Sequence, residues 1–351
     1  MPISAFDALS LAFEHTKKQL FQPFRLGQWS RLALVGLFAG EMSTGGGGGF
    51  PNFQIPTSTR HTHDNFAASP TIDPALLIPL IIIAVIGVAV LWLVFLYISS
   101  RMRFILFDSI INKKCEIRRM WRARREPAFR YFVWQIVFSL VAFAGIVVIV
   151  GVPALVVLGL GWFSHAREHI AGLILAGLAV FFIFMVAIVV MACVHVFTKD
   201  FVVPQMALED VSAFEGWRRL WERLRGEKAG YAGYAGMKVV MALGAAIAVT
   251  VVVVILVLLL LIPVGGVGLL SVLFGSAAGL SWNVFTITMV VVAGCVLLLV
   301  LFYGVSLISV PVIVFFPAYS IYFFAPRYQP LATLIYPPAT AYPTISPEAQ
   351  A

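Results

Sequence analysis

The chain has 351 residues, of which 61% are hydrophobic and only 11% are charged, and its formal net charge is +8. A soluble domain carries roughly 25% charged residues, so the composition excludes a large soluble core with a charged surface. The apolar runs do not alternate as barrel strands would, which predicts an all-α polytopic transmembrane helix bundle. The positive charge is typical of cytoplasmic loops, and no nucleic-acid partner is predicted.

Residues 4–22 are expected to form an amphipathic helix at the membrane surface, ended by Pro23. Ser4 can cap its first turn, with Asp7 three positions later as a weaker form of the capping box. Four apolar residues fall near one face of this helix. They are Phe6, Leu9, Phe13 and Leu20.

The first of about six spans is the most constrained by charge. Only residues 32–40 are free of charged side chains, about 14 Å of helix, whereas the hydrocarbon core is about 30 Å thick. Extending the span to residues 27–44 requires Arg31 and Glu41 to reach the two interfaces. A re-entrant or surface-lying helix is the alternative.

Residues 42–73 form a Gly-, Ser- and Thr-rich loop that we expect to be flexible. His61, His63 and Asp64 resemble a metal cluster, but three such ligands in a flexible loop do not define a coordination geometry. We therefore predict neither a metal site nor a cofactor.

Five further spans are expected at residues 74–100, 131–162, 170–196, 239–262 and 285–309. A strongly basic segment, residues 101–130, separates the first two of them. Between the last two, residues 263–283 are Gly-rich, which indicates a loop or a shallow re-entrant piece.

The apolar segment 310–324 is broken by two prolines and is expected to be an interfacial extension, with a seventh crossing as the alternative. Residues 1–325 then form a single membrane domain. The tail, residues 326–351, is rich in Pro and Tyr and is expected to be disordered.

Six spans place 22 of the 24 Lys and Arg residues on one side, with only Arg60 and Arg167 opposite. By the positive-inside rule the basic side is cytoplasmic. This predicts a multi-pass protein of a bacterial inner membrane with both termini in the cytoplasm.

Short matches indicate an internal repeat. Residues 4–7 and 212–215 differ only in Asp for Glu, and 115–118 is a weaker match between them. A second set of matches, the lead-in segments, comprises residues 104–107, 201–204 and 314–317. The hypothesis is a surface helix plus a transmembrane hairpin used three times, over about residues 4–100, 115–196 and 212–309.

The clearest surface helix begins at Ser212, where Glu215 completes a capping box. Its aromatic and basic faces suit a helix lying in the headgroup layer, and a connector helix packed on the bundle is the alternative. The candidate lipid-interface residues are Phe214, Trp217, Trp221, Arg218, Arg219 and Arg223 of this helix, and Arg118, Arg119 and Arg122 of the basic segment.

Reactive groups are sparse in the sequence. No Asp, Glu, Lys or Arg lies at the centre of the second to sixth spans, which disfavours proton relays and ion-coupled pumps. There is no P-loop, HExxH or GxSxG motif, and His195 near a span end is more typical of a structural histidine. No catalytic residue is predicted, and an integral membrane enzyme is the least favoured class.

Residues 201–204 leading to 212–221, together with the layout of surface helices before hairpins, resemble a family of uncharacterised bacterial multi-pass membrane proteins. That family is similar to the membrane domain attached to some glycerophosphodiester phosphodiesterases. Their hydrolase domain is absent here, so the resemblance does not imply their reaction.

The resulting hypothesis is a non-catalytic membrane-organising or partner-binding component. Its expected partners are the lipid bilayer, anionic lipid headgroups and another membrane protein. The alternative is a facilitator or transporter of a lipid or apolar solute, which would use small-residue helix interfaces rather than charges.

Overall fold

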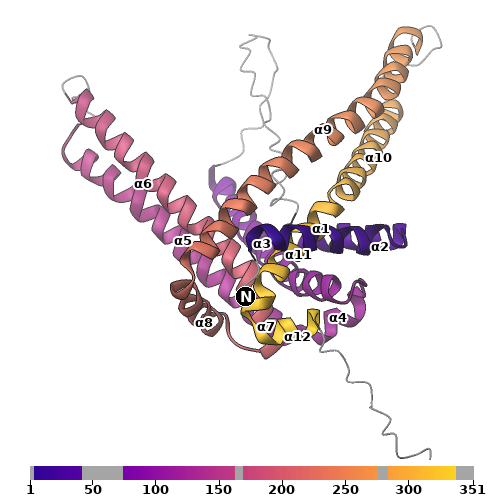
Figure 1. The fold of residues 1–351 in the computed structure, drawn as a ribbon. Coiled ribbons are helices and arrows are strands. Elements are labelled where there is room, and N and C mark those ends of the chain that lie inside the picture. Colours follow the sequence, from indigo (N-terminus) through magenta and orange to yellow (C-terminus); the bar gives the residue numbers. More distant parts are fainter. Residues whose placement is uncertain (1–3, 42–73, 163–168, 276–283, 337–351) are drawn as a thin grey trace, which may run out of the picture.

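The structure is a computed structural model that describes residues 4–41, 74–162, 169–275 and 284–336. Within these ranges the regular elements are helices and none is a β-strand (Figure 1), which confirms the predicted all-α fold. Five helices of the described chain are long and apolar enough to cross a membrane. They are α3 (Pro74–Ile111), α5 (Arg125–Gly159), α6 (Ile170–Phe197), α9 (Lys228–Gly275) and α10 (Val284–Ile308).

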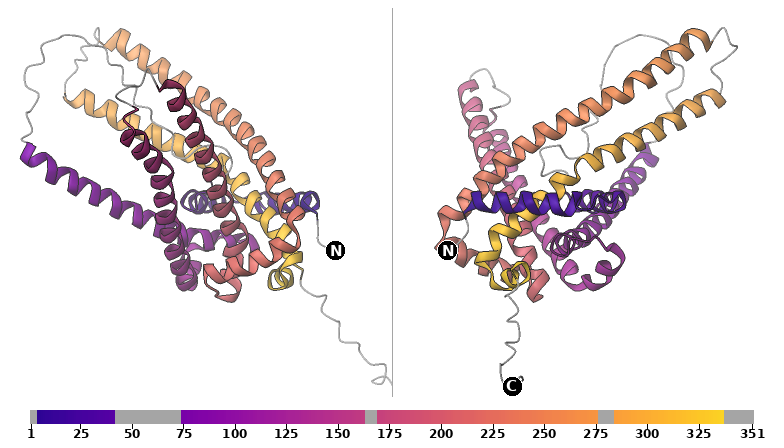
Figure 2. Two further views of the ribbon diagram at one scale, coloured as in Figure 1. Left: turned by 90° about the vertical axis from the view of Figure 1, so that its left-hand side faces the viewer. Right: turned by 45° about the vertical axis from the view of Figure 1, so that its right-hand side comes forward.

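The molecule consists of three arms and a hub. The arms are helix α3, the α5–α6 hairpin and the α9–α10 hairpin, and Figure 2 shows that they leave the hub toward the same side of the molecule. The hub contains the ends of these helices and the shorter elements. The shorter elements are α1 (Ala5–Phe21), α2 (Leu26–Phe38), α4 (Ile117–Ala123), η1 (Thr198–Val202), α7 (Val203–Glu209), α8 (Ala213–Gly226), α11 (Val310–Phe324), η2 (Ala325–Arg327) and α12 (Gln329–Ile335).

Five of the predicted spans coincide with the long helices, most closely α6 and α10. Two helices run well beyond their predicted C-terminal ends. Helix α3 continues into the basic segment as far as Ile111, and α9 continues through Pro263 to Gly275, where a loop or re-entrant piece was expected. Residues 263–275 carry no charge. Proline is tolerated in such apolar helices because neighbouring groups and local adjustments satisfy the freed backbone carbonyls.

The first predicted span differs most from the structure. Helix α2 has only 13 residues, about 20 Å of helix, which is short of the roughly 30 Å hydrocarbon core. Figures 1 and 2 show α2 lying across the direction of the arms, as the surface-lying alternative predicts. Glu41, expected at an interface, is instead buried in the hub. The remainder of that span, residues 42–44, lies outside the described residues.

The segment after the last span is buried within the hub. Ten of the 15 residues of α11 are buried, and the helix packs against α1, α2, α3 and η1. The chain then continues as η2 and α12, so the start of the tail that we expected to be disordered is helical. Leu331 is fully buried in the hub, and Arg327 pairs with Glu227, which together order this part. Residues 337–351 lie outside the described residues.

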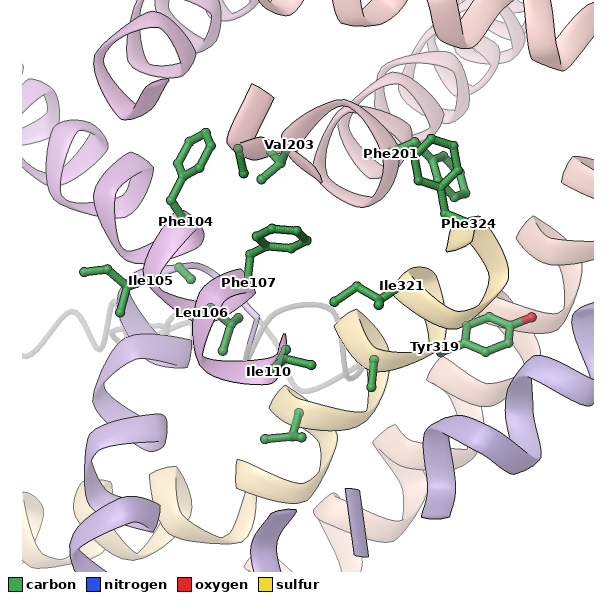
Figure 3. Close-up of a cluster of buried hydrophobic side chains, with 14 of the residues drawn as sticks. Phe104, Ile105, Leu106, Phe107, Ile110, Phe201, Val203, Tyr319, Ile321 and Phe324 are labelled. Atoms are coloured by element: carbon green, nitrogen blue, oxygen red, sulfur yellow. The ribbon is translucent and has the colours of Figure 1, made fainter. Parts of the chain in front are cut away.

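The centre of the hub is formed where the three lead-in segments meet. Figure 3 shows Phe107 from α3, Val203 from α7 and Ile321 from α11 lying between the three helices. Phe104 and Phe201, which begin the first two lead-in segments, are fully buried. Burying a side chain of this size stabilises the fold by about 1.5–3 kcal/mol relative to leaving it exposed. The lead-in segments therefore supply much of the hub's packing energy.

Each of these core helices is covered by a surface helix. Helix α4 packs on α3, α8 packs on η1 and α7, and α1 packs on α11. The first two covering helices follow their core helix directly in the sequence, whereas α1 comes at the start of the chain and α11 near its end. The hub is therefore closed by contact between the two ends of the chain.

The two matched helix starts have the same cap. The Oγ of Ser4 accepts a hydrogen bond from the backbone N–H of Asp7 at 3.1 Å, and the Oγ of Ser212 accepts one from Glu215 at 3.3 Å. Each serine satisfies a backbone donor that the first turn of a helix leaves without a partner. The serine caps predicted for both helices are confirmed, whereas the Glu215 carboxylate, which was expected to complete a capping box, is bound by Arg218 and Arg219.

Two glycines allow helices to approach closely in the hub. A Cβ at Gly216 of α8 would lie 2.7 Å from Cγ1 of Val202, and one at Gly36 of α2 would lie 2.4 Å from Cγ2 of Ile313. Both distances are shorter than carbon atoms tolerate, so a side chain at either position would push the two helices apart.

Candidate functional site

Helix α8 carries six of the nine predicted lipid-interface residues, and the structure divides them into two groups. The exposed group is Phe214, Arg218 and Trp221. The half-buried group is Trp217, Arg219 and Arg223. The face packed on the hub is made by Ala213, Gly216 and Leu220. Helix α8 is thus packed as a connector, while part of its aromatic and basic surface remains open.

Two of the half-buried residues tie α8 to the hub. Trp217 donates its indole N–H to Oγ1 of Thr198 at 2.9 Å. The guanidinium of Arg223 lies over the rings of Phe324 and Tyr328, 5.6 and 5.1 Å from their centroids. Because these groups are engaged by the protein, Trp217 and Arg223 hold α8 in place rather than face the solvent.

The other two arginines of α8 share a carboxylate. Arg218 Nη2 and Arg219 Nε each lie 3.0 Å from Oε1 of Glu215, and Arg219 also pairs with Glu209. The hydrogen bond from Arg219, with the charge of Arg218, holds the pKa of Glu215 below its usual range. Much of the positive charge on this helix is therefore balanced within the protein.

The arginines of α4 are more open. Arg118, Arg119 and Arg122 are exposed and line a shallow hollow of about 650 Å³. Their only ion pair in the described chain joins Arg119 to Glu116 at 3.6 Å. Figure 1 shows α4 and α8 on different sides of the hub, so the two predicted groups do not form one patch.

Helix α1 turns part of its predicted apolar face outward. Phe6 and Phe13 are 68% and 66% exposed, whereas Leu20 is buried. The face against the hub consists mainly of small and polar residues. They are Ala8, Ala12, His15, Thr16, Gln19 and Leu20. Exposed phenylalanines on a helix that lies across the arms are typical of a membrane–water interface.

The hub also contains a group of buried charged residues that the sequence did not indicate. We call it the buried charge cluster. It consists of Glu41, Arg103, Lys199, Asp200 and Lys238, and each is at most 8% exposed. These residues come from the chain after α2, from α3, from η1 and from the start of α9. The cluster therefore joins all three arms at the point where they enter the hub.

The first half of the cluster is centred on Glu41. Its Oε2 accepts a charged hydrogen bond from Lys199 Nζ, and its Oε1 lies 3.8 Å from Arg103 Nη1. Arg103 also donates from Nη2 to the carbonyl oxygen of Ala39. Charges buried to this extent are stable only when they are paired, so Glu41 ties α3 and η1 to the end of α2.

The second half is centred on Asp200. Its Oδ2 accepts hydrogen bonds from Lys238 Nζ and from the hydroxyl of Tyr234 at 2.9 Å, which links η1 to α9. Lys199 and Asp200 are neighbours in η1, a five-residue π-helix in which every residue is buried. Single π-helical turns interrupt α-helices, often at functional sites. Here the turn holds two adjacent side chains of opposite charge, of which Lys199 pairs with Glu41 and Asp200 with Lys238.

In the sequence these residues resemble interfacial loop charges, because each stands at the polar end of an apolar run. The repeat contained one indication that two of these residues are buried. Arg103 and Asp200 immediately precede the first two lead-in segments, so they occupy equivalent positions with opposite charge. A charged residue placed directly before a buried aromatic segment is itself drawn into the core.

Two further ion pairs stabilise contacts in the hub. Arg124 makes two hydrogen bonds to Asp108, both of 2.8 Å, which raise the pKa of the arginine. Arg327 binds Glu227 through two hydrogen bonds of 2.6 and 2.8 Å, and this contact lowers the pKa of the Glu227 carboxyl. Paired, bidentate geometry of this kind fixes orientation as well as adding energy.

A histidine network holds α1. His15 Nδ1 lies 3.0 Å from the Tyr322 hydroxyl, and His15 Nε2 lies 3.1 Å from Oε1 of Gln19. Gln19 in turn donates to the carbonyl oxygen of Ser109 at 3.0 Å. Burial, reinforced by the positive charge of Lys113, lowers the pKa of His15. The network joins α1 to α11 and α3.

The chemistry available to these groups is charge pairing. Within the part of the chain that the structure describes, no three His, Cys, Asp or Glu side chains converge as metal ligands would. The weak candidate His61, His63 and Asp64 lies outside the described residues. The three cysteines are unpaired: Cys115 is buried, and Cys193 and Cys295 are exposed on the arms.

A comparison with known protein families gives one finding. The family model described as "Family of unknown function (DUF7544)" matches residues 3–334, nearly the whole chain. No curated protein and no solved structure matches the chain. The expected similarity to membrane domains attached to glycerophosphodiester phosphodiesterases gains no support from these comparisons.

Proposed function

We propose that this chain, which belongs to the DUF7544 family of unknown function, is a non-catalytic membrane-organising protein. In this proposal the hub holds three apolar arms in the bilayer, and the arms bind lipid and the transmembrane helices of a partner. The arms are the functional surface and the hub is the device that positions them.

The observation that carries the proposal is the exposure of the arms. None of the residues of α6 is buried, and the most apolar stretches of α3, α9 and α10 are likewise unburied within the chain. Leu175 of α6, Leu259 of α9 and Leu299 of α10 are each 68% exposed. Exposed apolar area on this scale needs a covering, which only lipid or another protein provides.

The distribution of basic residues supports a position of the hub at the cytoplasmic face of the membrane. Apart from Arg60 and Arg167, which lie outside the described residues, the Lys and Arg residues belong to elements or helix ends at the hub. In this proposal the positive-inside rule puts the hub and both described chain ends in the cytoplasm of a bacterial cell, with the arms in its inner membrane. Both ends can lie on one side only if the chain crosses an even number of times, so the proposal needs a sixth crossing before Pro74 besides the five long helices. The exposed arginines of α4 and the aromatic residues of α1 and α8 then meet anionic headgroups.

The lead-in segments support a three-fold repeat as the origin of the arms. The first two segments are buried throughout, and Val314 and Phe316 of the third are buried. Each segment leads to the centre of the hub and carries a covering helix. On this proposal one unit of surface helix and hairpin was used three times, and the copies differ most in the first hairpin, where α2 is short.

Crosslinking in native membranes tests the proposal. A photoreactive amino acid is placed at Leu175 or Leu299 on the arms, with Glu222 on the exposed side of α8 as the matched control. We expect a discrete protein adduct from the arm positions and none from Glu222. Adducts with lipid alone, combined with lipid flux in proteoliposomes, would overturn partner binding and favour the facilitator alternative.

Two further measurements address orientation and lipid contact. Reporter fusions near Arg60 and Arg122 are expected on opposite sides of the membrane, and the same side for both would sink the proposed topology. Changing Arg118, Arg119 and Arg122 together to Gln, and then to Glu, should reduce co-purified anionic lipid in two steps, because each basic residue contributes about 1 kcal/mol near an anionic surface. Unchanged lipid retention in both variants would remove α4 from the interface.

A further inference from the structure

An open hollow lies at the base of two arms, where α3 and α5 pack against each other at the edge of the hub. Its volume is about 440 Å³, and it is lined by Tyr97 of α3 and by Arg125, Glu126, Phe129 and Arg130 of α5. Pockets that bind small molecules typically measure about 300–1,000 Å³. The hollow is therefore large enough for a polar group of the size of a lipid headgroup.

The two arginines of the hollow are available to a ligand. Arg125 and Arg130 are exposed, and neither forms an ion pair within the described part of the chain. Glu126 is four positions before Arg130, a spacing that allows a helical ion pair, but Arg130 Nη1 donates instead to the carbonyl oxygen of Asp210. This hydrogen bond uses only one donor of the guanidinium and holds the group in place. Two arginines and one glutamate give the lining a formal charge of +1.

A buried arginine positions the tyrosine on the other wall of the hollow. Arg101 Nη2 donates to the Tyr97 hydroxyl at 2.5 Å, and Nη1 donates to the carbonyl oxygen of Trp121 at 2.5 Å. The guanidinium lies over the rings of both residues, 5.1 Å from the centroid of Tyr97 and 5.0 Å from that of Trp121. Because the Tyr97 oxygen accepts this bond, its own O–H remains able to donate to a ligand. Arg101 is itself buried, so it contributes a fixed positive charge behind the hollow rather than a contact.

The hollow lies where the polar hub gives way to the apolar arms. Phe129 is 54% exposed at its edge. One helical turn further along the arms, on the same helix faces, are the exposed apolar side chains of Leu93 and Val133. Aromatic residues are enriched at the level of the headgroups, and basic pockets between transmembrane helices on the cytoplasmic side bind anionic headgroups. A ligand with a phosphate and acyl chains fits this order of side chains.

We propose that this hollow binds the headgroup of one anionic glycerophospholipid of the phosphatidylglycerol class. The phosphate accepts hydrogen bonds from Arg125 and Arg130, a headgroup hydroxyl donates to Glu126, and the acyl chains follow the apolar faces of α3 and α5. The lipid charge of −1 balances the lining, whereas a phosphatidylethanolamine headgroup has no net charge and leaves the lining unbalanced. The inference rests on the proposed placement of the hub at the membrane surface, and it adds a defined site to the general attraction between basic residues and lipid.

Native mass spectrometry of the delipidated full-length chain in a neutral detergent tests the site. The chain is titrated with phosphatidylglycerol, and separately with phosphatidylethanolamine of the same chain length. We expect saturable binding of one phosphatidylglycerol per chain, with clearly weaker binding of phosphatidylethanolamine. An excess of soluble glycerol phosphate should not displace the lipid. Equal affinity for the two lipids would overturn the anionic class, and displacement by glycerol phosphate would show a site for a soluble phosphate instead.

Three variants with a matched control locate the binding. Changing Arg125 and Arg130 together to Gln should weaken phosphatidylglycerol binding by about tenfold or more, because it removes both phosphate donors. Arg125→Gln alone should weaken it by a smaller factor, and it leaves the contact between Arg130 and Asp210 intact. Glu126→Gln keeps an acceptor oxygen but removes the negative charge of the lining, and should tighten binding several-fold.

The control changes Lys17 of α1 and Arg225 of α8 together to Gln, which removes the same formal charge from exposed positions outside the hollow. We expect this variant to bind the first phosphatidylglycerol as the native chain does. Equal weakening by the control would reduce the effect to general electrostatics and overturn the site. The topology reporters test the membrane placement separately, so a confirmed topology without saturable phosphatidylglycerol binding would overturn this inference alone.

Discussion

Helices α6 and α11 have similar apolar compositions and opposite environments. In α6, which forms one side of an arm, no residue is buried, whereas in α11, which runs through the hub, ten of 15 residues are. An apolar helix can therefore be solvated by lipid or packed in protein, and hydrophobicity alone does not distinguish the two. The difference lies in the neighbours. Helix α11 lies beside buried aromatic rings and paired charges, and the arm part of α6 does not.

This contrast gives the two regions different sensitivities. The hub is packed like the core of a soluble protein, so the volume and charge of its side chains are fixed by their neighbours. The arms face a fluid solvent that adjusts to any apolar side chain. Paired substitutions of the same residue type in the two regions test this difference directly.

The largest effect is expected at Phe201. It is fully buried and makes ring contacts with five other aromatic residues. They are Phe197, Tyr231, Tyr234, Phe323 and Phe324. Phe201→Ala should lower the free energy of unfolding by about 3–5 kcal/mol, because it leaves a cavity in the hub. The measurement is unfolding by titration with a denaturing detergent, followed by circular dichroism.

The matched control is Phe182→Ala in α6, where the side chain is 59% exposed. Because lipid or detergent fills the space, we expect a much smaller change. Equal losses for the two variants would show that the arms are packed by protein in the folded chain, and the contrast between arm and hub would fail.

A second pair tests close packing. Gly216→Leu places a side chain where Cγ1 of Val202 already lies 2.7 Å from an ideal Cβ, and should cost about 1–3 kcal/mol. Gly177→Leu is the control, since nothing lies within 4 Å of a Cβ at that position in α6. Both changes remove a helical glycine, so the gain in helix propensity is common to them. A thermal melt of the two variants in detergent should separate them by several degrees, and coincident melts would contradict a tight α8 contact.

A smaller effect is expected at the Glu227–Arg327 pair. Glu227→Gln removes the charge that two hydrogen bonds from Arg327 stabilise, and should cost about 1 kcal/mol since Glu227 is partly exposed. The expected result is earlier cleavage after Arg327 by trypsin, because the start of α12 loosens. Glu222→Gln on the exposed side of α8 serves as the control and should leave the cleavage rate unchanged.

The smallest effect concerns pH. Burial lowers the pKa of His15, so this group contributes stability that is present above its unfolded pKa of about 6.5 and is lost as the pH falls below it. Between pH 7 and pH 5 the melting temperature of the hub should fall. The fall should be smaller in the His15→Gln variant than in the native chain. His169, exposed at the far end of an arm, provides the control. If His169→Gln reduced the pH dependence as much as His15→Gln, the assignment to α1 would be untenable.

The sequence predicted the parts of the fold that depend on local pattern. The spans at α6 and α10 agree to within a residue or two, and the caps at Ser4 and Ser212 form as expected. These features follow from runs of apolar residues and from the backbone groups that a helix start leaves open. The matches among the lead-in segments also identified the residues that meet in the hub, although their burial was not expected.

What the sequence did not predict depends on contacts between distant residues. Lys199 and Glu41 are 158 positions apart, and the sequence around either residue does not indicate the other as its ion-pair partner. The face that α1 packs on the hub was missed for the same reason. Its small residues fit against α11, while Phe6 and Phe13 point away. Trp217 and Arg223 looked like lipid-facing residues because the helix pattern does not show which of its sides meets protein.

The closure of the hub by α1 on α11 also has a consequence for biosynthesis. His15 and Tyr322, which meet at this contact, are 307 positions apart in the chain. At about 5–20 residues per second, a ribosome needs about 15–60 s to make the second partner after the first. During that interval the arms enter the bilayer one after another, and α1 is not yet in contact with α11. Its exposed phenylalanines give it a temporary place at the membrane surface, so the first helix made is among the last to dock.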